Sequence, residues 1–213
     1  MPLREPAPEV PWRAPQGWWE ANMWGEPLLL QGLRGALSRG DEVSARETLE
    51  LLALVEDASA TARASAALAW ARLGERARAG AILGQTERAW VRRDPDRTCE
   101  AMRGLEASAR ERFPELAIVA LDLCLAVRDD SEALRLRADL AIAQGDVSTS
   151  HALLQRLVAA DPDALEPTLK LVELLAVYMG QGDEAQRLLD VASARHPHEP
   201  RIDEVRTIVD GVR

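Results

Sequence analysis

Aromatic residues, lysine and cysteine are all scarce in this 213-residue chain: aromatics make up 4%, Lys170 is the only lysine, and the only cysteines are Cys99 and Cys124. Residues favoured in strands, such as isoleucine, threonine, tyrosine and phenylalanine, are few, whereas the helix-favouring residues alanine and arginine are abundant. This composition argues against a sheet-based fold and predicts an all-α protein.

Long apolar runs are also missing, since no stretch reaches the roughly 18 apolar residues of a membrane-spanning helix. The first ten residues, MPLREPAPEV, lack the apolar core of a secretory signal. We therefore expect no membrane span and a cytoplasmic location. The net charge of −9 disfavours nucleic-acid partners, which need a basic face. The excess of arginine over lysine, together with many alanines, suggests a GC-rich, bacterial coding sequence.

The two cysteines show no CxxC spacing, and Cys124 lies in the apolar run LDLCLAV. Buried cysteines behave as small hydrophobic residues, and disulfides are rare in reducing compartments. We therefore predict two buried free thiols rather than a disulfide, and we do not expect a catalytic nucleophile at Cys124.

The clearest pattern lies between Ser131 and Pro162, where apolar residues recur at spacings of three and four on both sides of Gly145. Two antiparallel helices joined by a turn at Gly145-Asp146 explain this pattern, and Asp161-Pro162 ends the second helix. Because one helix pair cannot bury its apolar faces alone, neighbours of the same kind are expected.

Similar segments do occur before and after this one. The small residues that begin the second helices are spaced by 34, 38, 33 and 35 positions, and they are Ala45, Ala79, Ala117, Ser150 and Ala185. With this period, the chain resembles the tetratricopeptide repeat family over roughly Glu26 to Pro197. The best matches are in the last two pairs: Leu134, Ala138, Ala141, Gly145, Leu154 and Pro162, then Leu171, Leu175, Gly180, Ala185, Leu189, Ala192 and Pro197.

The resemblance implies a right-handed superhelix of antiparallel helix pairs, that is, a TPR-like α-solenoid with a concave groove lined by the first helices. We expect a Trp/Pro-rich arm, about five helix pairs and a C-terminal capping helix: 1–25; 26–59, 60–97, 98–130, 131–164 and 165–199; and 200–213. The third pair fits least well because Arg112 stands where the turn glycine is expected, so four repeats plus a divergent helix pair is the alternative.

Motifs for catalysis or cofactor binding are absent from the sequence. No phosphate loop, nucleophile elbow, zinc-protease or EF-hand spacing occurs. The proline in His196-Pro197-His198 breaks any helical ligand pair, which favours a solvated loop over a metal site. We therefore expect a non-enzymatic protein without cofactor or metal.

Candidate binding residues follow from the presumed groove, where the residue just after the crossing residue of each first helix should point inward. These positions are Arg34, Leu68, Glu106, Asp139 and Glu173, and Met102, Arg135 and Leu169 lie four residues earlier on the same faces. The acidic ladder Glu106-Asp139-Glu173 has two interpretations. It could bind a basic segment of a partner, or it could be neutralised internally by nearby arginines such as Arg110 and Arg135.

The arm, residues 1–25, holds four of the six tryptophans and five of the twelve prolines. Proline density excludes a regular helix before about Gln16, and a short helical turn near Gly17 to Met23 is expected. Exposed tryptophans are unfavourable, so the arm should pack either on the first helix pair or on a partner. We assign Trp12, Trp18 and Trp19 to partner binding, including a possible homodimer.

These observations favour a non-enzymatic adaptor or scaffold that binds a protein or peptide segment in the groove, through the arm, or both. Two alternatives remain open. The protein could be a dedicated chaperone for a secreted or assembling client, or it could be a regulatory subunit of a partner enzyme.

Overall fold

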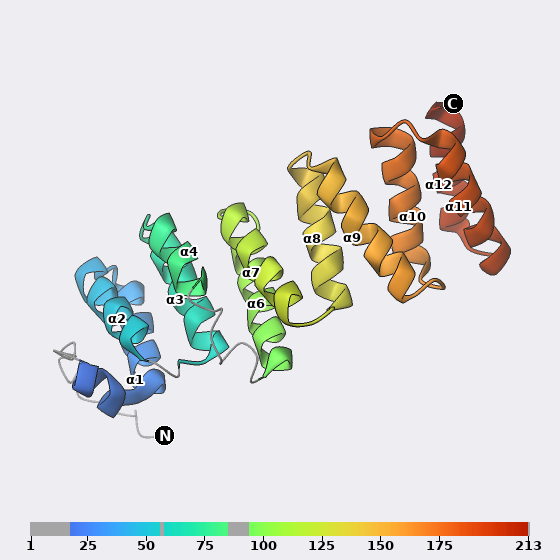
Figure 1. The fold of residues 1–213 in the computed structure, drawn as a ribbon. Helices are drawn as coiled ribbons and strands as arrows, with labels where there is room; N and C mark the ends of the chain where they lie inside the picture. Colours follow the sequence, from blue (N-terminus) through green and yellow to red (C-terminus); the bar gives the residue numbers. More distant parts are fainter. Residues whose placement is uncertain (1–17, 56–57, 85–93, 213) are drawn as a thin grey trace, which may run out of the picture. The chain divides into compact units, whose positions relative to one another are not determined.

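The chain is all-helical. The computed structural model describes residues 18–55, 58–84 and 94–212, with backbone only for residues 18–24, and every regular element in these ranges is a helix (Figure 1). The chain divides into two compact units, Met1–Arg93 and Asp94–Arg213, and each is described by itself.

The first unit contains two antiparallel helix hairpins in its described part. Their helices are α1 (Trp18–Arg39), α2 (Glu42–Leu54), α3 (Ala60–Arg72) and α4 (Arg76–Gly84). Helix α1 is kinked at Gly25, which has φ 69° and ψ 163°, and Pro27 follows directly inside the helix. This kink lies where the sequence pattern separates the arm from the first helix pair.

The second unit contains three hairpins and a closing helix. In chain order these are α6 (Pro95–Ala109) with α7 (Pro114–Val127), α8 (Ser131–Ala143) with α9 (Val147–Ala160), α10 (Leu165–Glu173) and its extension η2 (Leu174–Tyr178) with α11 (Gly182–Arg195), and α12 (Pro200–Val212). Each hairpin packs on the next, and α12 covers α10, η2 and α11. Helix α6 starts at Pro95, before the predicted boundary at residue 98, because Asp94 caps it and proline is favoured in the first turn.

Glycine residues with positive φ close four of the five described hairpins, and they are Gly40, Gly74, Gly145 and Gly180. At Gly145 the Asp146 N–H donates to the Ala141 carbonyl oxygen at 2.8 Å, and the Gly145 N–H donates to that of Ile142 at 2.9 Å. These two bonds form the Schellman arrangement, which needs a left-handed residue that glycine adopts without strain. Gly145 and Gly180 have φ of 75° and 65° at these turns.

The third predicted pair lacks this glycine, yet α6 and α7 still form a hairpin. Its turn closes through bonds from the Arg112 and Phe113 N–H groups to the Ala109 carbonyl oxygen, at 3.1 and 2.7 Å. Pro114 then occupies the first turn of α7, where no N–H is needed. A turn of this kind needs no positive φ, so Arg112 is tolerated.

The first helix of the last hairpin ends in a π-helical turn, Leu174–Tyr178. The Met179 N–H donates to the Leu174 carbonyl oxygen five residues back, and the Gln181 N–H donates to that of Leu175 at 2.8 Å. One extra residue is thus accommodated before Gly180.

Small residues stand at the helix crossings, as predicted. The five that begin the second helices are 0–1% exposed: Ala45, Ala79, Ala117, Ser150 and Ala185. Among the described residues, the Ser150 hydroxyl is the one fully buried side-chain polar group without a hydrogen-bond partner. Backbones that approach closely need a short side chain here, even when its hydroxyl stays unpaired.

The prediction of two free thiols is wrong. Cys99, in the first turns of α6, and Cys124, near the end of α7, form a disulfide across their hairpin with Cα atoms 4.6 Å apart. The antiparallel pairing brings two residues 25 positions apart in sequence into direct contact, which sequence spacing alone did not reveal.

The buried position of Leu154 in the core of the second unit predicts the effect of shortening its side chain. Leu154 is 0% exposed and belongs to a continuous apolar cluster from α8, α9, α10, η2, α11 and α12. Leu154→Ala should lower the free energy of unfolding by about 2–5 kcal/mol because it leaves a cavity. Urea unfolding measures this, with the neighbouring exposed Gln155→Ala expected within about 0.5 kcal/mol of wild type. Equal midpoints for the two variants would contradict this assignment of Leu154 to the core.

Candidate functional site

Charged side chains from α6, α8 and α10 converge on one face of the second unit. On α8, Arg135 bonds the Glu132 carboxylate through Nη2 at 2.5 Å and the Asp139 carboxylate through Nη1 at 3.2 Å. Lys170 of α10 donates from Nζ to the other oxygen of Asp139 at 2.6 Å. Asp139 therefore joins two hairpins by accepting from two cations.

The contribution of α6 to this face is a buried carboxylate. Glu106 is 1% exposed, and the Arg110 Nε donates to its Oε1 at 2.6 Å. Burial of a carboxylate is unfavourable unless it is paired and hydrogen-bonded, and Arg110 meets that need while staying partly in solvent.

The charges on the three helices influence one another. The hydrogen bond to Glu106 raises the pKa of Arg110, and the nearby Asp139 carboxylate also acts in this direction. The hydrogen bond to Glu132 raises the pKa of Arg135, while the same bond lowers the pKa of Glu132 against the opposing effect of its burial. We name this group of six side chains the charge network: Glu106, Arg110, Glu132, Arg135, Asp139 and Lys170.

The charge network agrees with the interpretation of internal neutralisation at two of the three positions of the acidic ladder. Glu106 and Asp139 each accept from a basic side chain on the same or a neighbouring helix, as the interpretation of internal neutralisation requires. Glu173 of α10 is half-buried. The pKa of Arg201 is raised mainly by its hydrogen bond to Glu166, and the negative charge of Glu173 contributes a smaller effect in the same direction. The charge network itself is therefore balanced, with three acidic and three basic side chains, whereas Glu173 is a further acidic residue outside it.

Two of the predicted binding residues are core residues instead. Met102 and Leu169 are 0% exposed, and Leu169 packs in the apolar cluster with Leu134 and Leu154. Met102, Arg135 and Leu169 lie at equivalent positions of their first helices. The adjoining hairpin covers the two apolar side chains, and of these three residues Arg135 alone stays accessible.

The remaining predicted residues belong to the first unit. Arg34 of α1 is exposed and Leu68 of α3 is half-buried. Trp12 lies outside the described residues. Trp18 and Trp19 begin helix α1, and their side chains lie outside what the structure describes.

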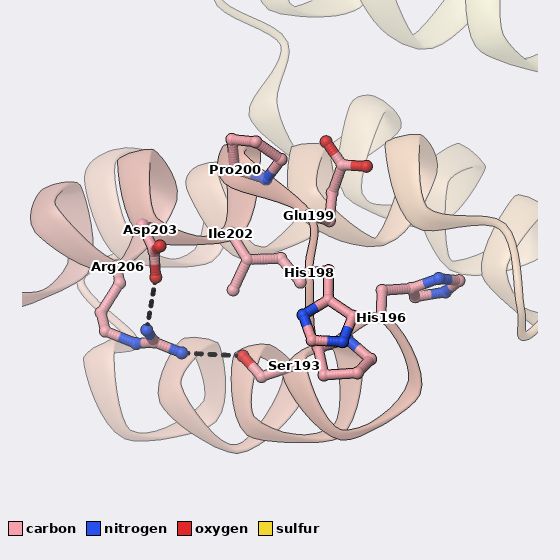
Figure 2. A pocket seen from close by; sticks show the side chains of 9 residues that line it. Ser193, His196, His198, Glu199, Pro200, Ile202, Asp203 and Arg206 are labelled. Atoms are coloured by element: carbon pink, nitrogen blue, oxygen red, sulfur yellow. Dashed lines mark hydrogen bonds and ion pairs between the residues drawn. The ribbon is translucent and has the colours of Figure 1, made fainter.

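A polar pocket of about 260 Å³ lies where α11 ends and α12 begins (Figure 2). The Arg206 guanidinium spans it, bonding Asp203 at 2.7 Å and the Ser193 hydroxyl at 2.8 Å. The one guanidinium of this pocket is thus already paired, and the Glu199 carboxylate also lines it.

The histidines at this pocket do not form a metal site. The His196 ring nitrogen Nε2 lies 3.1 Å from the Asp163 carbonyl oxygen, and Figure 2 shows its ring turned away from His198. Within the described ranges, the group with metal-ligating potential is Cys99, Cys124 and Asp130, and it contains no histidine.

Sequence reasoning missed Glu132 and Lys170. The spacing of Glu132, Arg135 and Asp139 at i, i+3 and i+7 does place all three on one helix face, so that signal was available. The bridge from Lys170 to Asp139 depends on how α8 and α10 pack, and no sequence pattern reports it.

These stacked antiparallel hairpins define an α-helical repeat protein. Residues 141–207, from the end of α8 into α12, match the family model described as a tetratricopeptide repeat. Over these residues the chain is similar to the tetratricopeptide repeat family, in agreement with its sequence period. No curated protein matches the chain.

Repeats of this family generally mediate protein–protein interactions, and the family is typically non-enzymatic. In the described part of the chain, the helices are all too short or too polar to cross a bilayer.

The charge network predicts a pH-dependent coupling between Glu132 and Arg135. Because the pKa of Glu132 is lowered in the folded state, the pair should stabilise the fold above the unfolded pKa of about 4.3 and lose that effect as pH falls through the lower folded value. A double-mutant cycle with Glu132→Gln and Arg135→Gln should give a coupling of about 0.2–1 kcal/mol at neutral pH.

Urea unfolding of the wild type, the two single variants and the double variant, at neutral pH and at about pH 3, measures this coupling. We expect it to shrink toward zero at the acidic pH. A coupling that is unchanged there would show that the carboxylate charge does not stabilise this pair.

Proposed function

We propose that the protein is a non-enzymatic adaptor that holds a segment of a partner protein on the face of the second unit formed by α6, α8 and α10. The repeat family supports protein binding in general. The observation that carries the choice of face is the charge network, which links α8 to α10 through Asp139 and Lys170, places the Arg110 guanidinium of α6 within the field of Asp139, and remains partly accessible.

Exposure decides which residues a partner can reach. The side chains of Arg110, Glu132, Arg135, Asp139 and Lys170 are 46%, 46%, 36%, 31% and 23% exposed. Glu106 sits beneath them and holds Arg110 in place. A partner thus meets an ordered row of alternating charges whose own pairing fixes the side-chain positions, which lowers the entropy lost on binding.

The balance of the charge network also indicates the chemistry of the partner. A strongly basic segment would have to displace Arg135 and Lys170 from Asp139, whereas a segment with both charges can pair with each member of the row. We therefore propose a polar segment of mixed charge rather than a purely basic one. Glu173, half-buried on α10, extends the row by one acidic position.

Site-specific photocross-linking in the native host tests this function. A benzophenone amino acid in place of Arg135 or Glu173, on the first helices, should trap one discrete protein partner. Matched controls are the exposed Gln155 of α9 and Arg187 of α11, on the second helices. The partner should be absent or reduced at least about tenfold at these controls, because close contact specifies cross-linking.

Cross-links of equal yield from all four positions, or from the second helices alone, would contradict the proposed face. The identity of a partner trapped from Arg135 and Glu173 also distinguishes an adaptor from the two alternative functions. A dedicated chaperone would trap an unassembled client, and a regulatory subunit would trap one enzyme. The tryptophan-rich arm remains a second proposed contact, open to the same method at Trp12.

A further inference from the structure

Three metal-ligating side chains meet in the interior of the second unit. The Cys99 and Cys124 sulfurs and a carboxylate oxygen of Asp130 all lie within 4.8 Å of one another. The residues come from α6, from α7 and from the connection that caps α8, and they are 1%, 0% and 6% exposed. A disulfide between the sulfurs explains the two cysteines but does not require a buried carboxylate beside them.

The Asp130 carboxylate is held in a fixed orientation. Its Oδ1 accepts from the Ala133 N–H at 2.8 Å and from the Arg103 Nη1 at 3.3 Å, while its Oδ2 lies 4.0 Å from the Arg128 Nε. Hydrogen bonds of this kind to a ligating carboxylate orient it toward a metal. Oδ1 is thus committed to the helix cap and to Arg103, whereas among the described residues Oδ2 has only the longer ion-pair contact with Arg128.

We propose that the reduced protein binds one thiophilic divalent cation, such as Zn²⁺, through Cys99, Cys124 and Asp130, and that the disulfide is the oxidised, metal-free form of this site. A dithiol reductant supplies two electrons and two protons, which break the S–S bond and leave two protein thiols and the disulfide of the reductant. Metal binding then displaces both thiol protons and forms two metal–sulfur bonds.

Charge balance favours this ligand set. Two thiolates and one carboxylate carry three negative charges, which a divalent cation and the Arg103 guanidinium together neutralise. Arg128 already pairs with Asp96, so it adds no uncompensated charge. Without a metal, two thiolates in this buried position would be unfavourable, so the reduced cysteines would stay protonated.

The donor types select the metal. Thiolate sulfur together with a carboxylate oxygen suits Zn²⁺, whereas Mg²⁺ and Ca²⁺ prefer oxygen ligands alone. Three protein ligands leave a fourth tetrahedral position for water or for a group brought by a partner. Because both sulfurs are buried, a reductant reaches them only when the α6–α7 hairpin opens, so the exchange between the two forms should be slow.

Cobalt titration of the full-length protein, after reduction with a phosphine, tests the proposal. Co²⁺ should bind with one-to-one stoichiometry, give thiolate-to-cobalt charge-transfer absorption, and be displaced by Zn²⁺. The oxidised protein and the Cys99→Ser/Cys124→Ser variant should lack this absorption. Asp130→Asn keeps a helix cap of the same shape but should weaken binding at least about tenfold. The His196→Ala/His198→Ala variant is the matched control and should bind like wild type.

Three results would overturn the proposal: no charge-transfer absorption in the reduced wild type, binding by the double-serine variant as tight as wild type, or unchanged affinity in Asp130→Asn. Circular dichroism of each variant checks that it folds. If a variant unfolds, X-ray absorption of the reduced, zinc-loaded wild type decides instead. Two sulfur ligands with oxygen ligands support the site, and any other set contradicts it.

Discussion

Close approach of two helices at a small residue is the constraint on which each described hairpin depends. In each described hairpin an alanine or serine lies in the first turn of the second helix, and each of these residues is essentially inaccessible to solvent. A larger side chain there would push the backbones apart and move every residue that follows. Ser150 meets this size requirement although its buried hydroxyl has no hydrogen-bond partner among the described residues. The alternation of first and second helices, and hence the charge network on the first helices, follows from this packing.

Much of the fold could be read from the sequence because it depends on local rules. The crossing residues, the turn glycines Gly145 and Gly180, and the apolar positions such as Leu154 repeat at a fixed period, so a pattern reports them directly. The π-helical turn before Gly180 was not predicted, and the turn at Arg112 was visible only as a missing glycine, because several backbone conformations fit the same number of residues.

The candidate site was less predictable because it depends on contacts between elements. Sequence reasoning placed Glu106, Arg135 and Asp139 correctly on the first helices but treated Met102 and Leu169 as accessible, although both are buried by packing between hairpins. It also missed the Lys170 bridge and assigned free thiols to Cys99 and Cys124. Each error concerns a partner supplied by another helix, which spacing along one helix does not specify.

Substitution at a helix crossing tests the central claim most directly. Ser150→Leu and Ala152→Leu add similar bulk two residues apart on α9, but only the first residue is buried at the crossing, and the second is exposed. We expect Ser150→Leu to lower the free energy of unfolding by about 1–3 kcal/mol or more through overpacking. Ala152→Leu should stay within about 0.5 kcal/mol of wild type. Equal urea midpoints for the two variants would contradict the account, because the hairpins would then not depend on a small residue at their crossing.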